Sequence, residues 1–516
     1  MYLDIALKNA NVHTLNPTKP TAEAVGVREG KIELVGKEEK IERQSGEETK
    51  RIDCKGYPLL PAFIDAHTHF SSMGVRMENH LDLAEVDCKR ELLEKVEAEA
   101  PNCAVGREEW FVGYNWDESG WKEGKSFPRK EELDDVLPHR PVALIRVDGH
   151  LACVNGKALD LLDLDPELQG FEREKGEPTG RLAENAADAV REAIQPNVEE
   201  IAEGVRAATK RAHQLGVSGV QDASAGKGQL RAYQTLAKEG ELGVRVSAFP
   251  RLGLLDQLIQ LGLRPGFGDS WFELGPVKLF VDGSVGAKTA WVGEGYRENP
   301  ANCGTAIWES EELKGFLEEA QAEGIKVAIH AIGDKAILET LAAVEGARKK
   351  YGEVKHRLEH GEMLGEEELI KMKELGMTYS AQPNFVGNWG QPGGMYEERL
   401  GRERLEGMNP FKPALEKGIP LAFGSDCMPF DPFYGIHSAV HAPFEGQRLT
   451  PEEAIRAYTL GSARAAGWEE RLGSIEKGKR ADLLLLNDDP FQRPGEIKEM
   501  GPQLLLVEGK IVNSNI

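Results

Sequence analysis

The segment Pro61-Ala-Phe-Ile-Asp-Ala-His-Thr-His69 combines an apolar strand pattern with two closely spaced histidines. Its first half is typical of a strand in a parallel sheet, which is buried on both faces. Residues two apart on a strand point the same way, so His67 and His69 can share one metal ion at its carboxyl end. Such a pair is weak evidence when alone, because a buried histidine is also often a hydrogen-bonded core residue.

Seven further short runs rich in β-branched residues follow, and most of them precede a helical pattern. With the strand at 62–67, the predicted strands cover 217–222, 244–249, 277–282, 326–330, 357–360, 378–382 and 421–426. Segments such as 311–323, 335–350 and 366–375 carry acidic residues early and basic residues late, as helices do. Eight β-α units predict an α/β fold, a closed (β/α)8 TIM-type barrel with its active site at the carboxyl strand ends.

The first connection of this barrel is exceptional. Roughly 150 residues separate the first strand from the second, whereas βα loops usually have about 2 to 6. An inserted lid subdomain at about 75–200 is therefore predicted. It would lie on the catalytic face and bring Trp116 to the substrate. The alternative is that its aromatic residues form only the core of the insert.

The two ends of the chain are similar, with Val27-Arg-Glu-Gly-Lys-Ile32 near the start and Val507-Glu-Gly-Lys-Ile511 near the finish. Each pattern indicates a pair of strands around a glycine turn. We expect residues 1–58 and 467–516 to form one small β-sandwich, with the barrel of residues 59–466 inserted between its halves.

Composition argues against several classes of partner. The formal net charge is −23, so the surface field repels nucleic acids and anionic membranes. The sequence contains no apolar run long enough for a signal peptide or a membrane span, and a cytoplasmic protein is expected. Its six cysteines show no CxxC spacing, which argues against a zinc ribbon and a disulfide scaffold. Symmetric dimers are the commonest oligomers, so a homodimer is the default expectation.

Residues with metal-binding side chains gather at the predicted strand ends. The candidates are His67, His69, Lys278, His330, His360 and Asp426. Jointly they are much harder to explain as core residues than any single histidine is. Lys278 fits such a cluster if burial lowers its pKa and the neutral amine reacts with carbon dioxide to form a carbamate. The alternative is an ammonium paired with Asp282 or another acid.

Other catalytic motifs do not compete with this cluster. Residues 473–479 fit GxxxxGK, but Arg480 replaces the Ser or Thr of a P-loop. The sequence has neither a GxSxG nor a GxGxxG motif, so the usual indications of a serine hydrolase and of a dinucleotide-binding enzyme are missing. A metal-dependent enzyme is the interpretation that the residues favour.

The chain resembles the amidohydrolase superfamily, and in particular its amidohydrolase-3 branch of YtcJ-like proteins and N-substituted formamide deformylases. The resemblance covers essentially the full length. It rests on residues 61–69, Lys278-Leu-Phe-Val-Asp-Gly-Ser284, Thr289-Ala290, Ile329-His-Ala-Ile-Gly-Asp334, Leu358-Glu-His-Gly361, Phe423-Gly-Ser-Asp426 and Gly473-Ser-Ile-Glu-Lys-Gly-Lys-Arg-Ala-Asp482. Together these motifs are highly specific.

The resemblance implies a site for one or two divalent ions. In the two-metal form, His67, His69 and Asp426 hold the more buried ion, His330 and His360 hold the other, and carboxylated Lys278 bridges them. Zinc is the expected metal, and manganese, iron, cobalt and nickel are alternatives.

Two further motifs match the branch. In Asp148-Gly-His150 with Asn155, the histidine is expected near the substrate. Thr179-Gly-Arg-Leu-Ala-Glu184 matches another branch motif, to which the sequence assigns no role; ordinary helix-start chemistry is its alternative.

The predicted function is hydrolysis of a non-peptide C–N bond in a small molecule, an amide, formamide or cyclic amide, by metal-hydroxide attack. Asp426 is the expected general base, and His150 or the second ion is expected to polarise the carbonyl. The loop at 384–395 presents Trp389 for apolar substrate contact, unless it only seals the barrel. The same site could instead hydrolyse a carbamate or an ester or deaminate a heterocycle. A binding or regulatory protein without catalysis is the alternative from another class.

Overall fold

A computed structural model describes residues 2–100, 110–118, 121, 126–147 and 151–516 of the chain. The chain divides into two compact units. Unit 1 comprises Met1–Phe70, Thr209–Gly226 and Ala237–Ile516, and unit 2 comprises Ser71–Ala208 and Lys227–Leu236. The range predicted for the inserted subdomain, 75–200, lies inside unit 2.

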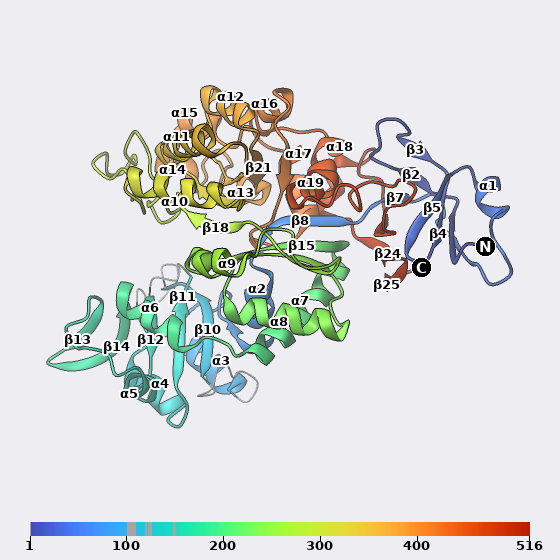
Figure 1. Cartoon of the computed structure of the whole chain (residues 1–516). Coiled ribbons are helices and arrows are strands. Elements are labelled where there is room, and N and C mark those ends of the chain that lie inside the picture. The colour runs from blue at the N-terminus through green and yellow to red at the C-terminus, as the bar shows by residue number, and fades with distance from the viewer. Residues whose placement is uncertain (1, 101–109, 119–120, 122–125, 148–150) are drawn as a thin grey trace. The chain divides into compact units, whose positions relative to one another are not determined.

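Unit 1 contains a strand at each of the eight predicted positions (Figure 1). These strands are β8 (Phe63–Thr68), β15 (Val217–Ala225), β16 (Arg245–Pro250), β18 (Val277–Phe280), β19 (Val327–Ala331), β20 (Arg357–His360), β21 (Thr378–Ala381) and β22 (Leu421–Phe423). All of their pairings are parallel. Parallel strands are buried on both faces, which explains why short apolar runs revealed them.

These strands form two sheets, whereas the sequence predicted one closed sheet. The first has the order β17-β16-β15-β8, with the additional strand β17 (Phe272–Leu274), and the second has the order β18-β19-β20-β21-β22. Gly275 and Pro276 separate β17 from β18, and a proline has no N–H to donate to a ladder. Contacts between the sheet edges include a bridge between Arg251 and Lys278, and the Asp426 N–H donating to the His67 carbonyl at 2.8 Å.

Helices follow most of these strands. Those of unit 1 are α1 (Glu38–Glu42), α9 (Leu255–Leu261), α10 (Ser310–Ala322), α11 (Asp334–Tyr351), α12 (Glu366–Leu375), α13 (Pro383–Asn388), α14 (Met395–Leu400), α15 (Arg402–Gly407), α16 (Phe411–Glu416), α17 (Pro432–Val440), α18 (Pro451–Arg456) and α19 (Ser462–Ala466). The predicted helices at 311–323, 335–350 and 366–375 are confirmed as α10, α11 and α12. Acidic first turns in all three complement the helix dipole.

Two further sheets of unit 1 contain the strands of the chain ends, and the second of them combines strands from both ends. One has the order β5 (Lys31–Gly36), β4 (Ala24–Arg28), β1 (Ile5–Lys8), β6 (Lys50–Asp53). The other has the order β25 (Lys510–Ser514), β24 (Pro502–Val507), β23 (Leu483–Leu486), β7 (Pro58–Pro61), β2 (Asn11–His13), β3 (Thr21–Ala22). In Figure 1 the first and last segments of the chain lie side by side, because β7 pairs antiparallel with β23. One apolar cluster takes Leu7 and Val27 from the first sheet and Leu59 and Leu483 from the second.

A buried ion pair connects the terminal strands to the parallel sheets. Arg245 on β16 donates from Nε and Nη2 to Asp482 at 3.0 and 3.2 Å. The Asp482 carbonyl accepts the N–H of Ala62, directly before β8, at 3.0 Å. Charge-assisted, bidentate bonds are among the stronger ones in proteins. This contact therefore helps to fix the start of the strand that carries His67 and His69.

Unit 2 is built on a mixed sheet with the order β13-β14-β12-β11-β10-β9. Its strands are β9 (Leu81–Asp82), β10 (Phe111–Trp116), β11 (Val142–Arg146), β12 (Leu151–Val154), β13 (Phe171–Glu174) and β14 (Glu177–Ala183). Its helices, three of which cross the unit boundary, are α2 (Phe70–Asn79), α3 (Lys89–Glu99), α4 (Lys130–Val136), α5 (Gly156–Leu162), α6 (Glu184–Ala193), α7 (Val198–Gln214) and α8 (Lys227–Glu239).

Trp116 is fully buried in the core of unit 2, with its ring centroid 6.1 Å from those of Trp121 and Phe127. The structure thus favours the alternative stated above for this residue, a core position of the insert, over the predicted contact with substrate.

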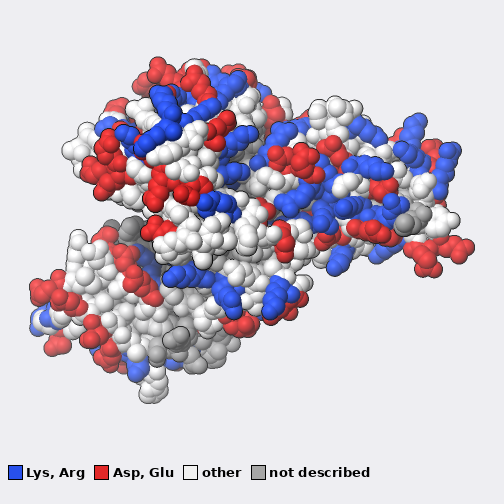
Figure 2. Space-filling model, viewed as in Figure 1, with Lys and Arg blue, Asp and Glu red and all other residues white. Residues whose placement is uncertain are grey.

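The surface carries charges of both signs. On the face seen in Figure 2, Lys and Arg side chains alternate with Asp and Glu, so the acidic excess is not gathered there in one patch. Within the described ranges, no helix is long and apolar enough to cross a membrane. The five cysteines that the structure describes, Cys54, Cys88, Cys153, Cys303 and Cys427, form no disulfide.

Candidate metal centre

Three of the predicted ligands lie at the carboxyl end of β8 and in the loop after β22. Asp65 accepts the N–H groups of His67 and Ser425 at 3.1 and 3.0 Å, and so ties the end of β8 to the residue before Asp426. Gly424 makes this approach possible, because a Cβ atom at this position would lie 2.4 Å from the His67 nitrogen. Two segments separated by more than 300 residues thus meet at one point.

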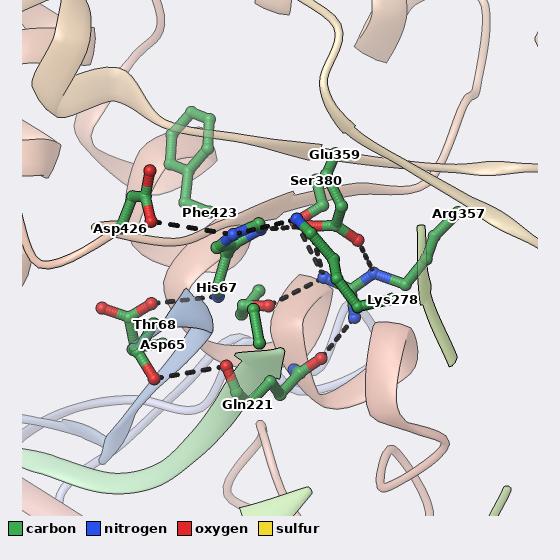
Figure 3. Close-up of polar contacts among 12 residues, drawn as sticks. Asp65, His67, Thr68, Gln221, Lys278, Arg357, Glu359, Ser380, Phe423 and Asp426 are labelled. Atoms are coloured by element: carbon green, nitrogen blue, oxygen red, sulfur yellow. Dashed lines mark hydrogen bonds and ion pairs between the residues drawn. The ribbon is translucent and has the colours of Figure 1, made fainter. Parts of the chain in front are cut away.

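His67, His69 and Asp426 form a compact cluster. His69 Nε2 lies 3.1 Å and His67 Nε2 lies 3.7 Å from Asp426 Oδ1. One ligand atom from each residue falls within 4.8 Å of the others. Figure 3 shows His67 between Asp426 on one side and Lys278 and Glu359 on the other. Two imidazoles and a carboxylate are a donor set that suits zinc and other divalent transition metals.

His330 and His360 lie beside this cluster, at the ends of β19 and β20. The His360 ring centroid is 4.3 Å from that of His330 and 4.9 Å from that of His67. Alternation along a strand would send Glu359 and His360 to opposite faces, yet both reach His67. His360 has a φ of +68°, and this left-handed backbone turns its imidazole toward the same side.

Three of the histidines donate one ring N–H to an acceptor outside the ligand cluster. His67 Nδ1 lies 2.5 Å from Glu359 Oε2, His69 Nδ1 lies 3.1 Å from the Ala223 carbonyl, and His330 Nε2 lies 3.0 Å from the Gly283 carbonyl. Metal-binding histidines commonly donate their second N–H to such acceptors. The Nδ1 atoms of His330 and His360 are buried without a hydrogen-bond partner. These free nitrogens fit a bound cation, which would satisfy them.

Lys278 completes the set of candidates that lie together. Its side chain is buried, and Nζ lies 3.4 Å from His67 Nε2 and 4.7 Å from the centre of the Phe280 ring. Burial lowers the pKa of Lys278 to about 8, although Glu359 and Asp426 oppose the shift. Asp282, which the sequence offered as a partner, instead accepts the backbone N–H groups of Trp291, Ile332 and Gly333.

The protonation states suit metal binding. Burial raises the pKa of Asp426, but a hydrogen bond from His69 and the nearby positive groups outweigh it and bring this pKa to about 2. Burial lowers the pKa of His330 to about 3 and holds that of His360 well below its usual range. At neutral pH the carboxylate is therefore ionised and these imidazoles are neutral, as metal ligands must be.

Comparison with known proteins agrees with this geometry. The profile described as "Amidohydrolase family" matches residues 50–513. The chain belongs to the amidohydrolase family. It is 30% identical to YtcJ of Bacillus subtilis (strain 168), over 97% of this chain and 98% of that protein. It is 28% identical to the N-substituted formamide deformylase of Arthrobacter pascens, over 98% of this chain and 97% of that enzyme. Such similarity over whole chains supports hydrolase chemistry.

A solved structure shares the fold of this amidohydrolase. The crystal structure of an uncharacterized metal-dependent hydrolase from Pyrococcus furiosus superimposes with a TM-score of 0.82 at 32% sequence identity. The match covers 94% of this chain and 99% of that protein. The α/β architecture expected from the sequence is thereby supported.

The other predicted site residues of this amidohydrolase belong to the loop at 384–395 and to the motif around His150. Trp389 is partly buried, and its ring lies 4.9 Å from Phe385, which stacks on His360 at 5.9 Å. Asp148-Gly-His150 lies outside the described residues. Asn155, which belongs to the same motif, caps α5 by accepting the Ala158 N–H at 3.0 Å.

The unassigned branch motif has a visible structural role in unit 2. Thr179 and Arg181 both donate to the carboxylate of Glu172 at 2.8 Å, which connects β14 to β13. Gly180 has a φ of +83°, and a Cβ atom there would lie 2.4 Å from the Val154 carbonyl oxygen. Glu184 begins α6 with a φ of +47°.

Sequence reasoning missed Glu359 and Arg357 beneath the metal centre. Both side chains are almost fully buried, and Arg357 Nη2 donates to Glu359 Oε2 at 3.2 Å. Glu359 precedes His360 in the motif Leu358-Glu-His-Gly361. A charged residue inside a strand that should be buried on both faces was the available signal.

Proposed function

We propose that this amidohydrolase hydrolyses a non-peptide C–N bond of a small molecule, an amide, formamide or cyclic amide. The observation that carries the proposal is the convergence of His67, His69 and Asp426 within 4.8 Å, with His330 and His360 beside them. The name of the relative from Arthrobacter pascens, N-substituted formamide deformylase, supports formamides as the first substrates to test.

The proposed cofactor is one or two divalent ions, with zinc as the first candidate. His67, His69 and Asp426 would hold one ion, and His330 and His360 the other. When bound, such ions make water nucleophilic at neutral pH and polarise a carbonyl. The neutral imidazoles of His330 and His360, whose Nδ1 atoms have no partner, and the ionised carboxylate of Asp426 fit this role.

Lys278 is proposed to carry a carbamate that links the two ligand groups. Its neutral amine would add to carbon dioxide and lose one proton, which gives a carbamate anion with two oxygen donors. Burial of the side chain and a lowered pKa near 8 favour the neutral amine that this addition requires.

Asp426 is proposed to move the proton. Its carboxylate lies at the centre of the cluster, 3.1 Å from His69 Nε2. It would accept a proton from the attacking water and return it to the leaving nitrogen. A low pKa keeps Asp426 available as the acceptor at neutral pH.

Around the site, Phe385 and Trp389 supply an aromatic wall next to His360, and Trp389 is the proposed apolar substrate contact. We also infer that the two parallel sheets are parts of one barrel and that the terminal sheets form a sandwich. The contacts at the sheet edges and the shared apolar cluster support this inference.

A panel assay tests the proposal. Purified protein is stripped of metal with a chelator, reloaded with zinc, and supplied with formamides, cyclic amides, carbamates, esters and aminated heterocycles. We expect turnover of a C–N substrate by the reloaded protein only. Asp426→Asn should reduce that turnover by about 10² to 10⁴, and Asp256→Asn, at an exposed position on α9, should leave it unchanged. Reloaded protein that cleaves no C–N substrate contradicts the proposal, as does full activity of Asp426→Asn.

A further inference from the structure

A buried polar network lies directly beneath the metal centre (Figure 3). At its middle, the Arg357 guanidinium donates to the side chains of Gln221, Glu359 and Ser380 and to the Ala66 carbonyl. The distances from Nη2 to Ser380 Oγ and to the Ala66 oxygen are 2.8 and 2.7 Å. These partners lie on β15, β20, β21 and β8, so the orientation of the guanidinium is determined from several sides.

Arg357 in turn determines the orientation of Glu359. Its Nε donates to Glu359 Oε1 and its Nη2 to Oε2, which is a bidentate contact. Glu359 has no solvent exposure. Both of its oxygens face the fixed positive charge of the guanidinium, which stabilises the ionised carboxylate. The carboxylate thus has one fixed direction, and Oε2 faces His67 Nδ1 at 2.5 Å.

The hydrogen positions on His67 follow from its neighbours. An ionised carboxylate can only accept, so Nδ1 of His67 must carry the hydrogen. On the other side of the ring, Nε2 faces Lys278 Nζ at 3.4 Å and Asp426 Oδ1 at 3.7 Å. With its hydrogen on Nδ1, the ring offers the lone pair of Nε2 toward Asp426 and His69.

We propose that Glu359, held by Arg357, is a positioning residue that fixes the Nδ1–H tautomer of His67 and so makes Nε2 its metal-binding atom. The inference rests on the metal site of the proposed function. In His69 and His330, a backbone carbonyl accepts the ring N–H and fixes the tautomer in the same way. In His67 the acceptor is a charged side chain, which also increases the basicity of the ligand nitrogen.

The variant Glu359→Gln tests this proposal sharply, because it keeps the size of the side chain. Arg357 has donors only, so it will take the single amide oxygen of the glutamine. The NH2 group then faces His67 Nδ1, which must become an acceptor, and the hydrogen moves to Nε2. A protonated Nε2 cannot bind a metal. Ser380→Ala is the matched control, because it removes one partner of Arg357 and leaves the contact between Glu359 and His67 in place.

Two measurements do not depend on activity. Zinc affinity is measured by competition with a chromophoric chelator, and thermal unfolding of the metal-free proteins reports the fold. We expect Glu359→Gln to bind zinc about 10 to 100 times more weakly than wild type, with Ser380→Ala within about threefold. A folded Glu359→Gln with wild-type affinity overturns the proposal. Wild-type protein that binds no zinc would instead refute the metal site itself.

If Glu359→Gln does not fold, the tautomer is measured on the wild type. Nitrogen-15 NMR of the metal-free protein distinguishes a protonated from an unprotonated ring nitrogen, and the His67 signals are identified by their loss in His67→Asn. Protonation of Nδ1 supports the proposal, and protonation of Nε2 overturns it.

Discussion

Gly424→Ala should damage the metal centre without removing any ligand. A Cβ atom at residue 424 would lie 2.4 Å from the nitrogen, 2.6 Å from the Cβ and 2.8 Å from the Cα of His67. Ordinary contacts of a Cβ begin at 3.4 Å, so β22 and β8 must separate by about 1 Å to relieve the overlap. We expect overpacking of this kind to cost about 1 to 3 kcal/mol of unfolding free energy.

The same displacement should also weaken metal binding. Ligand distances at a metal site tolerate about 0.2 Å, so moving His67 by about 1 Å relative to Asp426 should reduce zinc affinity at least tenfold. Urea unfolding and chelator competition measure the two effects. Gly346→Ala is the control: the Cβ that alanine adds at this position of α11 would lie 4.0 Å from Lys314 Cε, an ordinary contact, and alanine there should stabilise the helix by about 0.5 to 1 kcal/mol. Wild-type stability and zinc affinity in Gly424→Ala would refute the reasoning.

Three other perturbations have defined outcomes. Lys278→Met removes the proposed bridge, so metal analysis should find fewer zinc equivalents than in wild type; an unchanged zinc content in the variant contradicts the bridge. Arg245→Met leaves Asp482 as an uncompensated buried charge, and urea unfolding should show a loss of about 3 to 5 kcal/mol; an unchanged midpoint argues against this ion pair. Burial lowers the pKa of His356 from 6.5 to about 4, so its folded form binds fewer protons than the unfolded form. Its contribution to stability is complete above pH 6.5 and falls by about 3 kcal/mol as the pH drops to 4. His356→Gln should lose that part of the pH dependence in unfolding curves at pH 7 and 4, and a dependence equal to wild type would show that another group is responsible.

The strands and most metal-ligand candidates were predictable because of burial. A parallel strand covered on both faces must be apolar along its length, so a polar residue such as His330 or Asp426 at its end is conspicuous. Predicted strands were therefore found at all eight positions. The division into two sheets was not predictable. The edge strand β17 is only three residues long and ends directly before Gly275 and Pro276.

Side-chain direction was the main limit of the sequence reasoning. His360 and Glu359 are adjacent, so alternation assigns them to opposite faces, and only the left-handed φ of +68° at His360 brings both to His67. A glycine in the sequence would have indicated a positive φ, but a histidine gives no such indication. The sequence also does not tell a core tryptophan from one near the site. Trp116 is buried in the core of unit 2, whereas Trp389 packs against Phe385, whose ring stacks on His360.

Anomalous diffraction at the zinc edge, from crystals of the zinc-loaded protein, tests the central claim most directly. We predict a peak within coordination distance of His67 Nε2, His69 Nε2 and Asp426, about 2.0 to 2.2 Å from each ligand atom. A second peak is expected beside His330 Nδ1 and His360. Fully loaded crystals with no peak among these residues would contradict the claim that they hold the catalytic metal.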